Sequence, residues 1–228
     1  GQVSPPSGDY EAGSSVSLEA VPDMNYDFKG WQNASGVVVS TDLRWSVVMS
    51  SDLVYTGVFA PHVFTDDYER GGFNPALGYQ FNLPSSTGSW KVQTNDVAMG
   101  RYAARSAAVG HGQMSRLGLQ VNAAGGPASF AFKVSSEEGW DRLEFWLNGV
   151  EWSQWSGEVG WLRYEFTLPA GTNTLEWRYT KDHSVTVGLD AAFLDNLDLP
   201  LASGAVQVTF LPSGQAQLKL HGQPGRTY

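Results

Sequence analysis

Apolar and polar residues alternate with a period of two along much of the chain, the pattern of strands that bury one face. Turn-forming residues such as Asn148-Gly149 and Pro169-Ala170-Gly171 separate the alternating stretches. Helical periodicity is weak, and its best candidate is Asn95–Gly110. The pattern therefore predicts an all-β protein, with apolar rows at Val16/Leu18/Ala20, Leu117/Leu119/Val121, Phe130/Phe132/Val134, Leu143/Phe145/Leu147, Leu162/Tyr164/Phe166/Leu168 and Leu175/Trp177/Tyr179.

The alternating stretches fall into three segments. Residues 1–60 hold short strands and end at Phe59-Ala60-Pro61, and residues 62–200 hold most of the aromatic residues. Residues 201–228 provide two strands at most, too few to bury a core of their own. We interpret this last segment as a truncated C-terminal β segment, either the start of a further β module or strands docked on the second segment. The chain would then be a piece of a longer protein.

The amino-acid composition excludes several classes of binding partner and of chemistry. The 14 basic and 23 acidic residues give a net charge of −9, which argues against nucleic acid and anionic membrane surfaces. No apolar stretch is long enough for membrane insertion. Cysteine is absent, which excludes disulfides, thiol catalysis and zinc–thiolate sites.

The first segment carries a spaced motif. A Pro6-Ser7-Gly8-Asp9-Tyr10 stretch leads into a strand, then Phe28-Lys29-Gly30-Trp31 and a closing strand that ends at Phe59. This order resembles the bacterial internalin-type B-repeat, a small β-grasp-like module of extracellular proteins. The resemblance covers residues 1–60 and implies a spacer module without catalysis.

The second segment holds six of the nine tryptophans between Trp140 and Trp177. Its order of Leu143–Gly149, Trp155-Ser156-Gly157, Leu168–Asp182 and Asp190–Asn196 resembles a concanavalin-like jelly-roll module of large secreted bacterial proteins. The resemblance implies a β-sandwich over residues 62–200, related in shape to many carbohydrate-binding modules. Such sandwiches host many roles, so it bears on fold more than on activity.

Opposite the apolar rows, tryptophans alternate with charged residues. If the strands around Trp146 and Trp161 pair with these two residues opposite, opposite charges meet at neighbouring rungs. That register predicts the cross-strand pairs Trp146–Trp161, Glu144–Arg163 and Arg142–Glu165. A second hairpin that turns at Pro169-Ala170 adds the pairs Arg163–Glu176 and Trp161–Arg178.

These tryptophans supply the main functional hypothesis. The C–H faces of sugar rings stack on flat aromatic rings, and charged neighbours bind hydroxyl groups. We predict one carbohydrate-binding platform made of Trp146, Trp152, Trp155, Trp161, Glu144, Arg163 and Arg178. In the alternative interpretation a loop over residues 149–160 folds onto the sandwich and buries Trp152 and Trp155 as packing residues.

Acidic residues gather at both ends of the second segment, where first and last strands of a sandwich are commonly neighbours. Hard oxygen ligands brought together there suit a structural Ca²⁺, which takes six to eight oxygens. The predicted metal ligands are Asp66, Asp67, Glu69, Asp190 and Asp195, with Asp198 nearby in sequence. Solvated charges are the alternative.

No catalytic constellation stands out. Asp182-His183-Ser184 contains the residue types of a triad, but consecutive side chains cannot converge as one. Glu144 and Glu165 remain a conceivable carboxylate pair, although arginine partners would keep both ionised. We predict a non-enzymatic, carbohydrate-binding region of a large secreted or cell-surface bacterial protein that binds polysaccharide or oligosaccharide beside further modules of the same chain. The alternative is a structural or adhesive spacer without glycan affinity.

Overall fold

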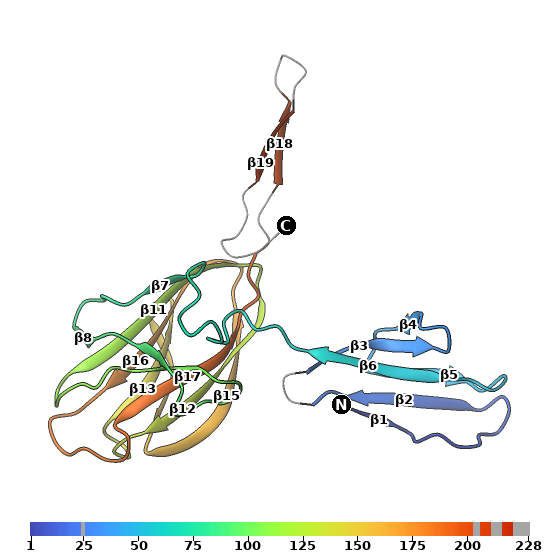
Figure 1. Ribbon diagram of the computed structural model, residues 1–228, viewed down its shortest axis with the longest axis horizontal. Helices are drawn as coiled ribbons and strands as arrows, with labels where there is room; N and C mark the ends of the chain where they lie inside the picture. The colour runs from blue at the N-terminus through green and yellow to red at the C-terminus, as the bar shows by residue number, and fades with distance from the viewer. Residues whose placement is uncertain (24–25, 203–205, 211–215, 221–228) are drawn as a thin grey trace. The chain divides into compact units, whose positions relative to one another are not determined.

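A computed structural model describes residues 1–23, 26–202, 206–210 and 216–220. Every regular element among these residues is a strand, so the prediction of an all-β protein is confirmed. None of the described residues forms a helix that could cross a membrane. The chain divides into two compact units, Gly1–Val63 and Phe64–Tyr228 (Figure 1).

The first unit consists of two antiparallel three-stranded sheets. One has the order β1 (Gln2–Ser4), β2 (Ser15–Val21), β5 (Arg44–Val48), and the other β4 (Val38–Ser40), β3 (Tyr26–Asn33), β6 (Tyr55–Pro61). Trp31 is almost fully buried and its indole N–H donates to the carbonyl of Asp42 at 2.9 Å. Phe28 contacts both Trp31 and Phe59, with ring centroids 5.4 Å apart in each pair. These aromatic side chains form the small core that a unit of this size requires.

A bulge in β3 fits the Phe28–Trp31 motif to the neighbouring strand. Gly30 has a φ of +134°, and a Cβ there would lie 2.8 Å from the carbonyl oxygen of Ser40. Only glycine allows both this dihedral angle and this close approach.

The second unit is a sandwich of two sheets (Figure 1). The five-stranded sheet has the order β15 (Glu158–Leu168), β12 (Gly126–Ser135), β17 (Ala191–Asp198), β10 (Ala103–Arg105), β9 (Lys91–Gln93). The six-stranded sheet has the order β14 (Val150–Ser156), β13 (Arg142–Leu147), β16 (Gly171–Thr180), β11 (Met114–Ala123), β7 (Gly78–Gln80). Its sixth strand, β8 (Ser86–Gly88), pairs with β11 in parallel.

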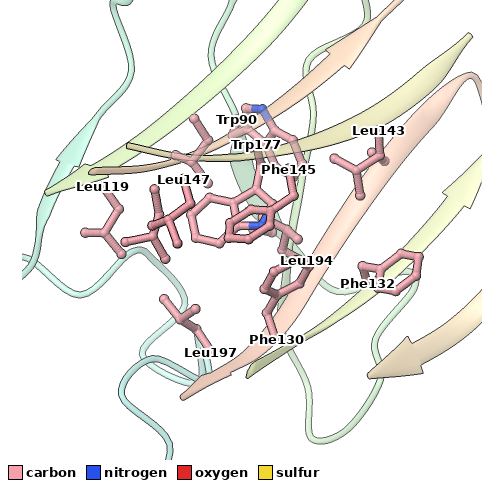
Figure 2. Packing of buried hydrophobic residues seen from close by; sticks show 14 of the residues in the cluster. Trp90, Leu119, Phe130, Phe132, Leu143, Phe145, Leu147, Trp177, Leu194 and Leu197 are labelled. Carbon is pink, nitrogen blue, oxygen red and sulfur yellow. The ribbon is translucent and has the colours of Figure 1, made fainter. Parts of the chain in front are cut away.

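The predicted apolar rows of the second unit meet between the two sheets, apart from Leu162, which is 56% exposed (Figure 2). Trp177 of the six-stranded sheet lies 5.6 Å from Phe145 and 5.4 Å from Phe130 of the five-stranded sheet, measured between ring centroids. Leu119, Leu143, Leu147 and Leu194 surround these rings and are also buried. Full burial of each such side chain stabilises the fold by about 1.5–3 kcal/mol.

The predicted register between the Trp146 and Trp161 strands is wrong. Strand β13 pairs with β14 and β16, and Trp146 lies opposite Glu176, whereas β15 with Trp161 pairs with β12 in the other sheet. Asn148 and Gly149 have positive φ values and form a two-residue hairpin turn, so the stretch expected to be a loop becomes strand β14. None of the five predicted cross-strand pairs therefore forms.

The C-terminal segment contains an antiparallel hairpin of β18 (Val206–Phe210) and β19 (Ala216–Leu220). Before it, Leu201 bridges to Ala123, and the N–H of Ala202 donates to the carbonyl of Asn122 at 2.9 Å. Residues 203–205, 211–215 and 221–228, included in the predicted truncated segment, lie outside the described residues.

Candidate functional site

Three of the predicted binding residues meet on the outer face of the six-stranded sheet. Because Leu143, Phe145 and Leu147 point into the core, Glu144 and Trp146 point outward from β13. Arg178 lies directly across from Glu144 on β16. We call Glu144, Trp146, Glu176, Arg178 and Arg116 the sheet-face cluster.

The indole of Trp146 is held on two sides. Its N–H donates to Oε2 of Glu144 at 2.9 Å, and the guanidinium carbon of Arg178 lies 3.9 Å from the ring centroid. This distance places the cation within cation–π range of the ring. Trp146 is therefore fixed in one orientation on the surface of the sheet.

Glu176 is the centre of the charges behind this ring. It accepts hydrogen bonds from Arg178 at 2.7 and 3.0 Å and is also ion-paired with Arg116. The Glu176 side chain is only 12% exposed. Burial by itself would raise the pKa of Glu176, but the hydrogen bonds from Arg116 and Arg178 outweigh it and lower the pKa. Glu176 therefore stays ionised over the whole physiological pH range, and its ion pairs hold Arg116 and Arg178 in place.

The other predicted binding residues lie elsewhere, so the prediction of a single tryptophan platform is wrong. Trp155 packs between the sheets, with its ring centroid 4.1 Å from that of Phe132. Trp152 is 45% exposed on the edge strand β14. Trp161 donates its indole N–H to Asp96 at 2.9 Å on the outer face of the five-stranded sheet, where Arg163 lies on the same strand. The binding role of each of these residues stays a prediction.

The five acidic residues predicted to hold calcium do not converge on one point. Asp190 precedes the first residue of β17, whereas Asp66 bridges to Leu197 near the other end of this strand, about 20 Å away at ~3.3 Å per residue. Asp190 is ion-paired with Lys181 instead.

Backbone N–H groups donate hydrogen bonds to the other predicted calcium ligands. Asp66 accepts the N–H groups of Tyr68 and Asn74, and Asp67 accepts that of Glu69. Glu69 in turn accepts two N–H groups at residues 101 and 102. Burial raises the pKa of Asp66 despite these bonds.

Asp195 is fully buried. Its carboxylate accepts the N–H groups of Ala98, Met99 and Asn196 at 2.8–3.3 Å. Burial and, to a smaller extent, the neighbouring charge of Glu69 raise the pKa of Asp195 to about 6, against the pull of its N–H donors. Glu69 and Asp195 therefore fasten the loop between β9 and β10 to the sandwich.

The most exposed tryptophan of this unit was not among the predicted binding residues. Trp140 is 61% exposed in the loop between β12 and β13. In the same region, oxygens of Glu137, Asp141 and Asp182 lie within 4.8 Å of one another. No sequence motif marks this arrangement, because it joins two loops about 40 residues apart along the chain and depends on the fold.

The structure places both groups of residues that the sequence offered for catalysis. Glu144 and Glu165 lie on β13 and β15, which belong to different sheets, so they are not a carboxylate pair. Ser184 donates its backbone N–H to Asp182 at 2.8 Å, a local contact within a loop.

A family model matches the first unit of the chain. Residues 1–63 match the family model described as the divergent InlB B-repeat domain, which confirms the resemblance stated for residues 1–60. A comparison of the chain with curated proteins gives no match.

Several solved structures are similar to the chain at low identity. TmCBM61, in complex with β-1,4-galactotriose, is 15% identical, with 60% of this chain and 94% of that chain covered and a TM-score of 0.38. The secreted serine protease VesC from Vibrio cholerae is 14% identical, with 82% of this chain covered and a TM-score of 0.42. The chain spans 43% of the length of VesC. CBM35 from Paenibacillus barcinonensis is 16% identical, with 51% and 96% covered and a TM-score of 0.29.

Proposed function

We propose that the sandwich unit is a non-catalytic carbohydrate-binding module and that a sugar ring stacks on Trp146. The observation that carries this proposal is the fixed indole, held by Glu144 and by the guanidinium of Arg178 on the outer face of a sheet. A ring that is already immobilised loses little conformational entropy when a ligand covers it.

The neighbouring polar groups suit the rest of a sugar. Arg142 is 41% exposed, lies two residues before Glu144 on the same face, and donates to the side chain of Gln154 at 2.7 Å. Amide and guanidinium groups bind hydroxyl groups by hydrogen bonds. Recognition of this kind needs no deep pocket, only a flat ring bordered by donors and acceptors.

The first unit fits a supporting role in the same proposal. Its match to the B-repeat family agrees with an extracellular bacterial protein in which this unit separates other modules. The sandwich would then direct further modules of the parent chain to a polysaccharide. Linkage between modules raises the effective affinity of weak individual sites.

Retention on insoluble polysaccharides tests the proposal. The full chain, incubated with a panel of such polysaccharides, is expected to bind at least one of them. Trp146→Ala should weaken this binding at least tenfold, equivalent to about 1.4 kcal/mol. Trp161→Ala is the matched control. It removes an indole that also donates to a carboxylate but lies on the five-stranded sheet.

A structural spacer without glycan affinity is the second candidate, and the B-repeat match favours it. In that case the sheet-face cluster only stabilises the sheet. The full chain would then show no retention on any polysaccharide, and Trp146→Ala would change the free energy of unfolding alone.

A further inference from the structure

The sandwich unit contains a buried lysine beside a buried aspartate. Lys181 follows strand β16 with a side chain that is 1% exposed, and Asp141 precedes strand β13 with a side chain that is fully buried. Strands β13 and β16 are antiparallel neighbours that pair Arg142 with Thr180, so Lys181 and Asp141 each lie one residue beyond this pair. Nζ of Lys181 lies 3.0 Å from Oδ2 of Asp141. A primary amine and a carboxyl group are thereby held together away from solvent.

The two oxygens of the Asp141 carboxylate have unequal contacts. Oδ1 accepts the N–H of Asp182 at 2.8 Å, whereas Oδ2 is buried and accepts no hydrogen bond from any described residue. Nζ of Lys181 donates instead to Asp190 and to two oxygens of the loop that follows β16. Buried acceptors in native proteins are nearly always satisfied, so an ion pair alone leaves the state of Oδ2 unexplained.

Asp190 supplies the base that a reaction between these two groups requires. Burial by itself would lower the pKa of Lys181, but the carboxylates of Asp190 and Asp141 outweigh it and raise the pKa, so the ammonium is the resting form. An ammonium has no free electron pair and must lose a proton before its nitrogen can attack. The carboxylate of Asp190 is hydrogen-bonded to Nζ and is therefore placed to accept that proton.

We propose that Nζ of Lys181 and the side-chain carboxyl of Asp141 condense to an amide after the chain has folded. Asp190 accepts a proton from Nζ, and the nitrogen electron pair attacks Cγ of Asp141 to form the C–N bond. The bond from Cγ to Oδ2 then breaks, and Oδ2 leaves as water with two of the three Nζ protons, which Asp190 transfers. The third proton stays on the amide nitrogen. The step consumes no oxidant and no further reactant.

The surroundings favour this bond. The N–H of Asp182 donates to Oδ1, the oxygen of Asp141 that carries negative charge during the attack, and stabilises that charge. Oriented groups within one molecule react as if present at about 10⁵–10⁸ M, which offsets the preference of free amines and acids in water to remain separate. The amide also replaces a buried cation and a buried anion by a neutral group, which removes the cost of keeping both charges out of water.

The amide would join the start of β13 to the end of β16. The chain contains no cysteine, so a bond of this kind would take the place of a disulfide. A covalent link between neighbouring strands restricts the unfolded chain and stabilises the folded one. The proposal is independent of glycan binding at Trp146.

Intact mass spectrometry of the full chain tests the proposal. The purified, folded chain should be lighter than its sequence by one water molecule. Trypsin should not cleave after Lys181, and the digest should contain a branched peptide that joins the segments of Asp141 and Lys181. A dehydration elsewhere, such as a cyclic imide at another aspartate, would leave these two segments in separate peptides.

Three variants separate the cross-link from the ion pairs. Lys181→Arg keeps the positive charge but lacks the attacking amine, and it should have the full mass of its sequence. Asp190→Asn keeps both reacting groups but lacks the base, and it should form the cross-link about 100-fold more slowly or not at all. Asp182→Asn is the matched control, because it removes a neighbouring carboxylate but keeps the backbone N–H that donates to Asp141, and it should cross-link as wild type does.

The full sequence mass in the folded wild-type chain after prolonged incubation would overturn the proposal. So would a loss of water that Lys181→Arg retains, or a cross-link that Asp190→Asn and Asp182→Asn slow equally. Circular dichroism verifies that each variant is folded. The mass and the peptide map of the wild-type chain decide the proposal even where a variant does not fold.

Discussion

The buried carboxylate of Asp195 makes the stability of the sandwich depend on pH in an unusual direction. Its pKa is about 6 in the folded chain, against an ordinary value of 3.8. The folded state therefore holds this proton more tightly than the unfolded state does. Stability from this group is fully present below about pH 4 and is lost as the pH rises through about 6.

The magnitude follows from the two pKa values. At about 1.4 kcal/mol per pKa unit, the ionised Asp195 lowers the free energy of unfolding by about 3 kcal/mol at pH 7 relative to pH 4. Asp195→Asn keeps an acceptor for the N–H groups of Ala98 and Met99 but cannot ionise. Relative to wild type, the variant should therefore gain about 3 kcal/mol between pH 4 and pH 7.

Urea unfolding of both proteins, followed by tryptophan fluorescence at several pH values, measures this difference. Both proteins contain the carboxylates whose pKa is lowered, such as Glu176, so their contributions to the pH dependence cancel in the comparison. A difference between variant and wild type that stays constant from pH 4 to pH 7 would refute the argument, as would one that changes in favour of wild type.

Three further substitutions test the packing, the buried charges and the loop anchors, each by urea unfolding at pH 7. Trp177→Ala should reduce the free energy of unfolding by about 3–5 kcal/mol, because it empties the centre of the core; a loss below 1 kcal/mol would contradict the packing. Lys181→Met leaves two carboxylates without their cation and should lower stability by about 3–5 kcal/mol, and an unchanged or raised stability would show that the ion pairs are dispensable. Gly100→Ala should lower the free energy of unfolding by about 1–3 kcal/mol, because its φ is +74° and a Cβ would lie 2.3 Å from Oε1 of Glu69. Gly72→Ala is the control and should change stability little, because a Cβ at Gly72 meets nothing within 4 Å.

Local patterns along the chain were enough to predict the strands and the core. The alternating rows around Phe130, Leu143 and Trp177 all line the interior, because a strand that buries one face must alternate. The B-repeat motif likewise agrees with the family model that matches residues 1–63. In each case the information lies within a few consecutive residues.

Which strands are neighbours could not be predicted in the same way. The charges of Glu144, Arg163 and Glu176 permit more than one complementary register, and surface pairs of this kind contribute too little energy to decide between them. The turn at Asn148-Gly149 carried the decisive information, since it makes the following residues a strand and moves Trp161 to the other sheet.

The residues of the candidate sites were likewise predictable only in part. The strand of Glu144 and Trp146 lies next to the strand of Arg178, whereas the predicted register placed the Trp161 strand between them. Glu137, Asp141 and Asp182 come from two loops, and their spacing depends on the anchoring of those loops to the sandwich. Spacing along the sequence contains no trace of such contacts.

The indole N–H signals of the nine tryptophans provide the most direct test of the central claim. In a ¹H–¹⁵N spectrum of the full chain, the signal of Trp146 is assigned by its loss in Trp146→Phe. Addition of an oligosaccharide from a retained polysaccharide should shift this signal in a saturable manner and leave that of Trp161 in place. A saturable shift at Trp161 or Trp140 with none at Trp146 would contradict binding at the sheet-face cluster.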